Sequence, residues 1–134
     1  MFELIKELAL FEKAPEQVTN TAEQMYADGF GVDPIFGAIV SELGSQIVGV
    51  AIFYYRYSTW KGKRLYLDDL IITERMRGCG LGERLLNAVV EKARQTACTG
   101  LMWQVLDWNK EAINFYKKFD ARFDEKWVNV HVDF

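Results

Sequence analysis

The stretch Arg77-Gly78-Cys79-Gly80-Leu81-Gly82 places three glycines at alternate positions between two segments of different pattern. Residues 65–72, just before it, are apolar apart from two aspartates and predict a buried strand. Residues 81–93, just after it, repeat their apolar side chains at helical spacing. Glycines at such a junction let the backbone adopt positive φ and approach a ligand closely. Because the first turn of a helix has unpaired N–H groups, this glycine loop (residues 77–82) predicts a phosphate-binding turn.

The spacing of the glycine loop excludes two common phosphate-binding patterns. It lacks the Gly-Lys-Ser/Thr end of a P-loop, and its third glycine comes one position too early for the dinucleotide fingerprint. The remaining pattern, Arg77-x-x-Gly80-x-Gly82, resembles the coenzyme A loop of the GNAT N-acetyltransferases. A glycine-rich turn also suits a helix entry that needs only flexibility, so the surrounding residues have to decide between the two interpretations.

Composition limits the class of protein. The chain has 134 residues, half of them apolar, and a net charge of −3, which gives no electrostatic support for binding nucleic acid. No apolar run approaches the roughly 20 residues that a membrane span needs. Cys79 and Cys98 have neither a metal-site spacing nor a disulfide framework. The N-terminal residues are partly acidic with helical periodicity, unlike a signal peptide. We therefore expect a cytoplasmic protein with no metal and no membrane or nucleic-acid partner.

The order of the predicted elements indicates an α/β (α+β) fold in a single domain, residues 1–134. Amphipathic spacing predicts helices at residues 2–12, from about 19–21 to 28–29, after the glycine loop, and at 110–119. Residues rich in β-formers predict strands at 35–43, 47–57, 65–72, 101–105 and 127–134. This is the order of the GNAT fold without its first strand. That fold has a mixed, mostly antiparallel central sheet flanked by helices.

Asp68 and Asp69 interrupt the apolar strand of residues 65–72. Adjacent residues of a regular strand point to opposite faces, so both cannot enter the core. A β-bulge would resolve this, and bulges often re-aim side chains beside active sites. The alternative is a pair of carboxylates that face water from an edge strand. Because burying a carboxylate is costly unless it is paired, two of them in a central strand favour a functional site.

A second chemical motif runs from Asn109 to Tyr116. Seven residues are about two helical turns, so the two side chains lie roughly on one face of a helix. By itself the pair also suits a helix cap and a core tyrosine. The full segment, residues 108–118, resembles the Asn…Ala-x-x-Phe-Tyr segment of GNAT enzymes. Two matches in the right order, separated by one helix and one strand, indicate membership of that superfamily.

Further stretches resemble the diamine (spermidine/spermine) acetyltransferases. They are residues 4–9, 16–18 and 28–31, the Trp60-x-Gly62-Lys63 turn, and Tyr66-Leu67-Asp68-Asp69. Three features depart from that subfamily. The strand before the first helix is missing, so we expect either a start site placed late or an incomplete sheet. Asp68 replaces a glutamate, and Met102 occupies a place where some relatives have a histidine.

The resemblance implies transfer of the acetyl group of acetyl-CoA, the cosubstrate, to a primary amine of a small cationic molecule, first of all a di- or polyamine. It implies that Asp68 accepts the proton of the ammonium, directly or through water, and that Tyr116 protonates the departing sulfur. Contacts to acetyl-CoA are expected at Leu70, Ile71, Ile72, Arg77, Gly78, Cys79, Gly80, Leu81, Gly82, Glu83 and Asn109. Contacts to the amine are expected at Asp68, Asp69, Glu12, Trp60 and Glu125.

Other interpretations remain open at this point. The acceptor could be thialysine or another lysine analogue, an aminoglycoside or a peptide N-terminus. The chain could also be a non-catalytic module that binds CoA, although it retains both Asp68 and Tyr116. The resemblance further implies a homodimer, with residues 127–134 as the exchanged or edge-paired strand.

Overall fold

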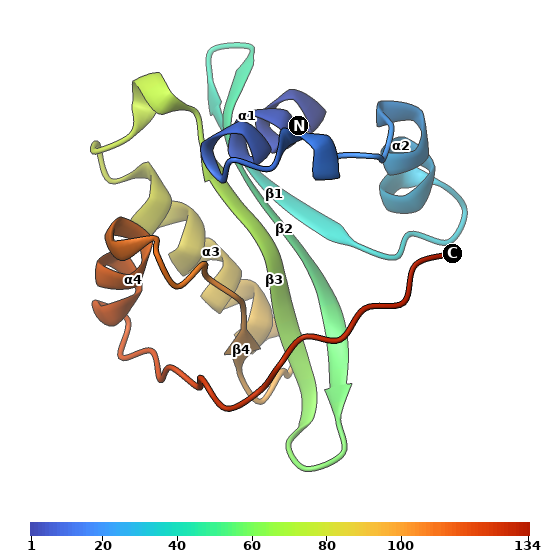
Figure 1. The fold of residues 1–134 in the computed structure, drawn as a ribbon, viewed down its shortest axis with the longest axis vertical. Helices are drawn as coiled ribbons and strands as arrows, with labels where there is room; N and C mark the ends of the chain where they lie inside the picture. The colour runs from blue at the N-terminus through green and yellow to red at the C-terminus, as the bar shows by residue number, and fades with distance from the viewer. The chain divides into compact units, whose positions relative to one another are not determined.

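The computed structural model describes all residues, 1–134 (Figure 1). They form two compact units, residues 1–103 and residues 104–134. The first unit contains most of the regular structure. In chain order its elements are α1 (Phe2–Phe11), the 3-10 turn η1 (Pro15–Gln17), α2 (Ala22–Phe30), β1 (Gly37–Leu43), β2 (Gln46–Ser58), β3 (Gly62–Ile72), the 3-10 turn η2 (Glu74–Met76), α3 (Leu81–Gln95) and β4 (Leu101–Met102).

The four strands form one mixed sheet in the order β1-β2-β3-β4. The pairs β1–β2 and β2–β3 are antiparallel, whereas β4 runs parallel to β3. The predicted mixed, mostly antiparallel sheet is therefore confirmed. β4 pairs only with Leu65 and Tyr66, so the rest of that edge of β3 has no strand neighbour. β4 is also shorter than the predicted strand at 101–105.

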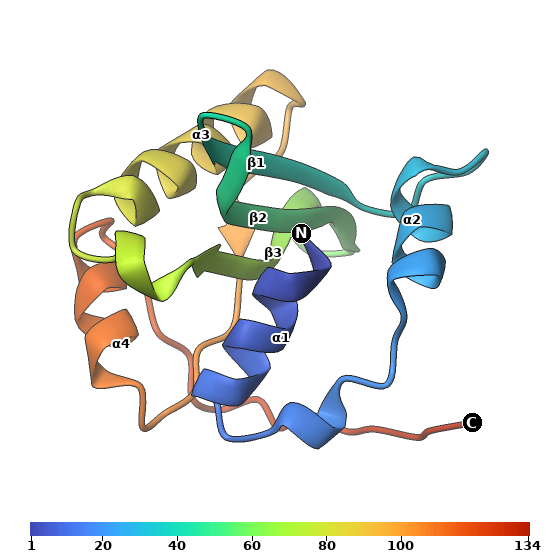
Figure 2. The same ribbon diagram turned by 90° about the horizontal axis from the view of Figure 1, so that it is seen from above.

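Helices cover both faces of this sheet, with α1 on one face and α3 on the other (Figure 2). On the α1 face, Leu4 of α1 and Met25 of α2 form a buried cluster with Val50, Ile52 and Ile71 of the sheet. The opposite face packs against α3, whose buried side chains are Leu85, Leu86, Val89 and Ala93. The sequence pattern of residues 81–93 predicted this stripe.

A β-bulge interrupts the pairing of β2 with β3. Ile52 pairs with Asp69 and the next residue, Phe53, pairs with Leu67, which leaves Asp68 as the extra residue of β3. The bulge predicted from the two adjacent aspartates is thus confirmed, at the predicted position. β3 is therefore not a regular edge strand that points both carboxylates into water.

The limits of the early elements follow local chemistry. Thr21 caps α2, because its Oγ1 accepts a hydrogen bond from the Gln24 N–H at 3.1 Å. The Gln24 side chain does not complete a capping box and instead donates to Asp28 at 2.8 Å. Gly44, at φ +61°, forms the turn between β1 and β2, which lies between the strands predicted at 35–43 and 47–57.

The second unit contains α4 (Lys110–Lys117) and no strand. The predicted strand at 127–134 is therefore wrong, although Val128, Val130 and Val132 alternate with polar residues. Their side chains are all highly exposed, between 77% and 85%. Alternation alone does not make a strand, because a strand also needs a neighbour to pair its backbone N–H and C=O groups.

Candidate active site

The glycine loop has the backbone geometry that its sequence requires. Gly78 and Gly80 have φ of +77° and +81°, values that side chains with a Cβ rarely adopt. A Cβ added to either glycine would meet no atom within 4 Å, so open space lies before the backbone at both positions. Gly80 is the N-cap of α3, and no side chain caps that helix. The loop therefore offers unpaired N–H groups and the positive end of a helix dipole to an anionic group.

At the end of β3, just before the glycine loop, successive backbone N–H groups point in two opposite directions, toward β2 and away from it. The Thr73 N–H donates to the Val48 carbonyl of β2 at 2.9 Å. Because alternate residues of a strand point their N–H groups to the same side, those of Leu70 and Ile72 point away from β2. They lie on the stretch of β3 that β4 does not pair. Leu70 and Ile72 are among the residues at which contacts to acetyl-CoA are expected.

The bulge places polar side chains on the face of the sheet that packs against α1. Asp69 lies opposite Ile52, which belongs to the cluster beneath α1. Tyr54, two residues after Ile52, shares that face with its partner Tyr66, and their ring centroids lie 5.1 Å apart. Burial raises the pKa of both tyrosines, and the negative charge of Asp68 adds to the rise. The two tyrosines thus lie beside Asp68. The sequence pattern did not point to these tyrosines, because their pairing depends on the register that the bulge sets.

Three carboxylates gather at this position: Asp68, Asp69 and Glu12, which is the C-cap of α1. Burial, followed by the negative charges of Asp68 and Glu12, raises the pKa of Asp69 to about 6. Burial also raises the pKa of Asp68, although part of its side chain reaches solvent, and that of Glu12. We call these three residues the carboxylate cluster.

No lysine or arginine forms an ion pair with the carboxylate cluster. The C-terminal end of α1, at Glu12, adds the negative end of a helix dipole. Like charges brought together in a half-buried site are unfavourable unless a cation joins them. The cluster can therefore bind an ammonium group, whose positive charge would offset the repulsion between the three carboxylates.

Comparison with known proteins decides the family. The sequence matches the Acetyltransferase (GNAT) family over residues 2–121. The chain belongs to this family. It is an acetyl-CoA-dependent N-acetyltransferase.

Among relatives of this GNAT enzyme, the thialysine N-epsilon-acetyltransferase of Mus musculus is 40% identical over 127 residues, which are 89% of this chain and 75% of the mouse protein. The spermidine/spermine N(1)-acetyltransferase-like protein 1 of Homo sapiens is 34% identical, covering 92% of this chain and 19% of that protein. A crystal structure of the aminoglycoside acetyltransferase meta-AAC0020, from an uncultured soil metagenomic sample, has a TM-score of 0.79. It covers 99% of this chain and 87% of that chain at 17% identity, a likeness of fold alone.

Further features concern metal ions, membranes and the cosubstrate of this GNAT enzyme. No group of three or more His, Cys, Asp or Glu side chains is arranged to bind a metal ion. None of its helices combines the length and the apolar character that crossing a membrane requires. The open backbone at Gly78 and Gly80 does fit a cosubstrate that carries phosphates.

The remaining predicted site residues lie in several places. In the second unit, Asn109 caps α4 by accepting the Ala112 N–H at 3.2 Å. Tyr116 is buried on α4, and its ring packs 5.4 Å from that of Phe115. In the structure Asn109 is thus a helix cap and Tyr116 a buried tyrosine, and their roles in acetyl transfer stay predictions. Glu125 is exposed, beyond α4.

Trp60 lies at the tip of the β2–β3 hairpin with 87% of its surface exposed. Gly62, the first residue of β3, is six positions from Asp68. At about 3.3 Å per residue this is about 20 Å along the strand. The structure therefore does not bring Trp60 to the carboxylate cluster of its own chain, and a cation–π contact to the amine stays a prediction.

Replacing Gly80 by alanine is expected to raise the Kd for acetyl-CoA about tenfold, because a methyl group would occupy the approach to the loop and disfavour its positive φ. Gly44 provides a matched control, since it has φ +61° and equally open surroundings but lies in the β1–β2 turn. Both alanine variants should lose about 1–2 kcal/mol of stability. Calorimetric titration with acetyl-CoA separates them, and equal Kd values for the two variants would contradict the assignment of the loop.

Proposed function

We propose that this enzyme acetylates the primary amine of a small aliphatic molecule whose ammonium group binds at the carboxylate cluster. The observation that carries the proposal is the set of three carboxylates, Glu12, Asp68 and Asp69, with raised pKa values and no ion pair of their own. Thialysine is the first candidate, because a relative of that name is 40% identical over most of both chains. A di- or polyamine is the second, favoured by the unpaired negative charge of the cluster.

The reaction needs a group that accepts a proton from the substrate. An alkylammonium with a pKa of about 10.4 is neutral in only about one molecule in 10³ at pH 7. We assign this proton to Asp68, directly or through water, and the binding of the charged ammonium to Asp69 and Glu12. The nitrogen of the amine then forms a bond to the acetyl carbon as the bond from that carbon to sulfur breaks.

The chain supplies two further groups to this reaction in our proposal. The N–H groups of Leu70 and Ile72 point away from β2, where they can bond the cosubstrate and polarise its carbonyl. The hydroxyl of Tyr116 would stabilise the departing sulfur and return a proton to it. The glycine loop and the first turn of α3 would hold the phosphates of the cosubstrate. They include Arg77, Cys79, Leu81 and Glu83.

A panel of amines tests the substrate. Thiol release from acetyl-CoA would be measured with thialysine, lysine, putrescine, spermidine, spermine, an aminoglycoside and a short peptide. We expect turnover with thialysine or with the small polyamines. The candidate with the larger kcat/KM is the preferred substrate. Turnover only with the aminoglycoside or the peptide, or with none of these amines although acetyl-CoA binds, would overturn the proposal.

The pH dependence of amine use should reflect Asp69. Its pKa of about 6 means that the carboxyl is protonated below that pH and charged above it. The substrate remains an ammonium up to about pH 10, so binding should strengthen as the pH rises through about 6. We expect kcat/KM for the amine to rise across this window.

The control is Asp69→Asn, which has no proton to lose at this position. Its kcat/KM should be lower and its rise near pH 6 should weaken or move. The KM for acetyl-CoA should not follow the same profile in either protein. An unchanged profile in Asp69→Asn would exclude Asp69 as the group that titrates.

A further inference from the structure

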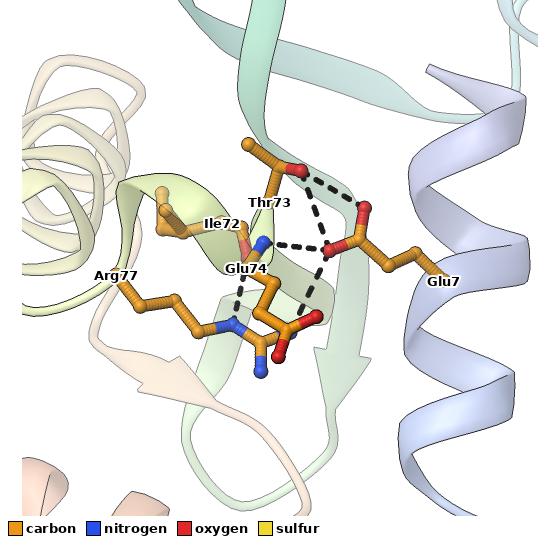
Figure 3. A network of polar contacts seen from close by, with 5 residues as sticks. All are labelled: Glu7, Ile72, Thr73, Glu74 and Arg77. Atoms are coloured by element: carbon orange, nitrogen blue, oxygen red, sulfur yellow. Dashed lines mark hydrogen bonds and ion pairs between the residues drawn. The ribbon is translucent and has the colours of Figure 1, made fainter.

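Glu7 of α1 connects that helix to the segment that leads into the glycine loop (Figure 3). Its carboxylate accepts hydrogen bonds from Thr73 Oγ1 at 3.0 and 3.3 Å and from the Glu74 N–H at 2.7 Å. It also lies 3.9 Å from a guanidinium nitrogen of Arg77. One half-buried side chain therefore contacts three groups that lie between residues 73 and 77.

The start of η2 depends on this contact. Thr73 is the N-cap residue of η2, yet its side chain makes no capping hydrogen bond. The Glu74 N–H, at the first position of the turn, is bonded instead by Glu7. An unpaired N–H at a helix start needs an acceptor, and a carboxylate is a strong one. Glu7 thus caps η2 from a different helix.

Arg77 extends the same connection to the first residue of the glycine loop. Its Nε donates to the Ile72 carbonyl at 3.0 Å, and its guanidinium lies 5.1 Å from the centre of the Phe11 ring on α1. The side chain of Arg77 is therefore turned back toward α1. Its role in this arrangement is to hold the loop at its base, while the backbone beyond it faces the open space at Gly78 and Gly80.

We propose that Glu7 is a positioning residue that sets the geometry of the glycine loop for acetyl-CoA. Glycines have wide conformational freedom, so a loop that contains Gly78 and Gly80 takes its orientation from contacts on either side. α3 fixes one side, and Glu7 with Thr73 and Arg77 fixes the other. A loop held in its binding conformation loses less conformational entropy when it binds. The inference rests on the proposed role of this loop and not on the identity of the amine.

The test is Glu7→Gln, which keeps the size of the side chain and removes its charge. We expect the Kd and KM for acetyl-CoA to rise about tenfold. The kcat at saturating acetyl-CoA and the KM for the amine should stay within about twofold, because Glu7 acts on the loop and not on the reacting atoms. Glu3→Gln is the matched control, since Glu3 lies one turn away on α1 and pairs only with Lys6 at 3.1 Å. Equal Kd values in the two variants, or a loss confined to kcat, would overturn the proposal.

A second pair of variants at Thr73 decides the matter if Glu7→Gln does not fold. Thr73→Val removes the hydroxyl donor at nearly constant volume, and Thr73→Ser keeps it. We expect the valine variant to raise the Kd for acetyl-CoA about threefold to fivefold, and serine to restore it. Equal Kd values for valine and serine would also contradict the proposal. Calorimetry needs no amine, so failure of the substrate assignment leaves this test intact.

Discussion

Replacing Asp68 by asparagine should lower kcat/KM for the amine by about 100-fold or more, within the range of about 10²–10⁴ that general acid–base catalysis contributes. Asparagine keeps the shape of the side chain but cannot accept a proton. Burial raises the pKa of Asp68, which brings it closer to that of an ammonium and makes the carboxylate a better base. The steady-state rate with saturating acetyl-CoA measures the loss.

Two further substitutions give this prediction its controls. Asp68→Glu keeps a carboxylate at this position and lengthens the side chain by one methylene, so it should retain far more activity than Asp68→Asn. Asp33→Asn makes the same chemical change in the exposed segment between α2 and β1, and it should leave the rate unchanged. If Asp68→Asn kept more than about a third of the natural kcat/KM, the range for acid–base catalysis would exclude Asp68 as the base.

Replacing Tyr116 by phenylalanine should lower kcat about 100-fold while the Kd for acetyl-CoA changes little. The change removes only the hydroxyl from a buried ring that packs against Phe115, so the helix should remain folded. A tyrosine hydroxyl is ordinarily a weaker acid than a thiol, so complete proton transfer to sulfur is uphill by about 2 kcal/mol. Stabilisation of the departing thiolate should therefore account for most of the effect.

The comparison that matters is between turnover and binding. Calorimetry with acetyl-CoA and steady-state kinetics would be run on the same preparations. Tyr57→Phe serves as the control, because that tyrosine lies near the end of β2 with 76% of its surface exposed. Equal losses in kcat and in affinity for acetyl-CoA would mean that Tyr116 serves the structure of α4 and not the leaving group.

Local chemistry made much of this structure predictable. The two adjacent aspartates predicted the bulge because neighbouring side chains of a regular strand point to opposite faces, and a bulge can re-aim one of them. The glycine loop was predictable because positive φ favours glycine, and because the helix that follows repeats its apolar residues at helical spacing. The valines at 128–132 misled because their alternation is local, whereas strand formation depends on a partner that the pattern does not specify.

The contacts of Glu7 could not be predicted from the sequence. Glu7 and Thr73 are 66 positions apart in the sequence, and a glutamate on an amphipathic helix is ordinarily a solvated side chain. The pairing of Tyr54 with Tyr66 depends on register across the bulge, which only the structure provides. The assignment of acetyl transfer needed the family, because three carboxylates and a glycine loop define a charge pattern but not a reaction.

The extra residue at Asp68 also changes the phase of β3. Leu65, Leu67 and Ile71 all have odd numbers and would share one face of an uninterrupted strand. Because the bulge shifts the alternation by one, Ile71 joins the cluster beneath α1 while Leu67, opposite Phe53, faces the other way. A single strand thereby contributes to the hydrophobic layers on both sides of the sheet. Asp68 is the residue at which the phase changes, so the residue that we assign to proton transfer lies at the point where the strand divides its side chains between the two layers.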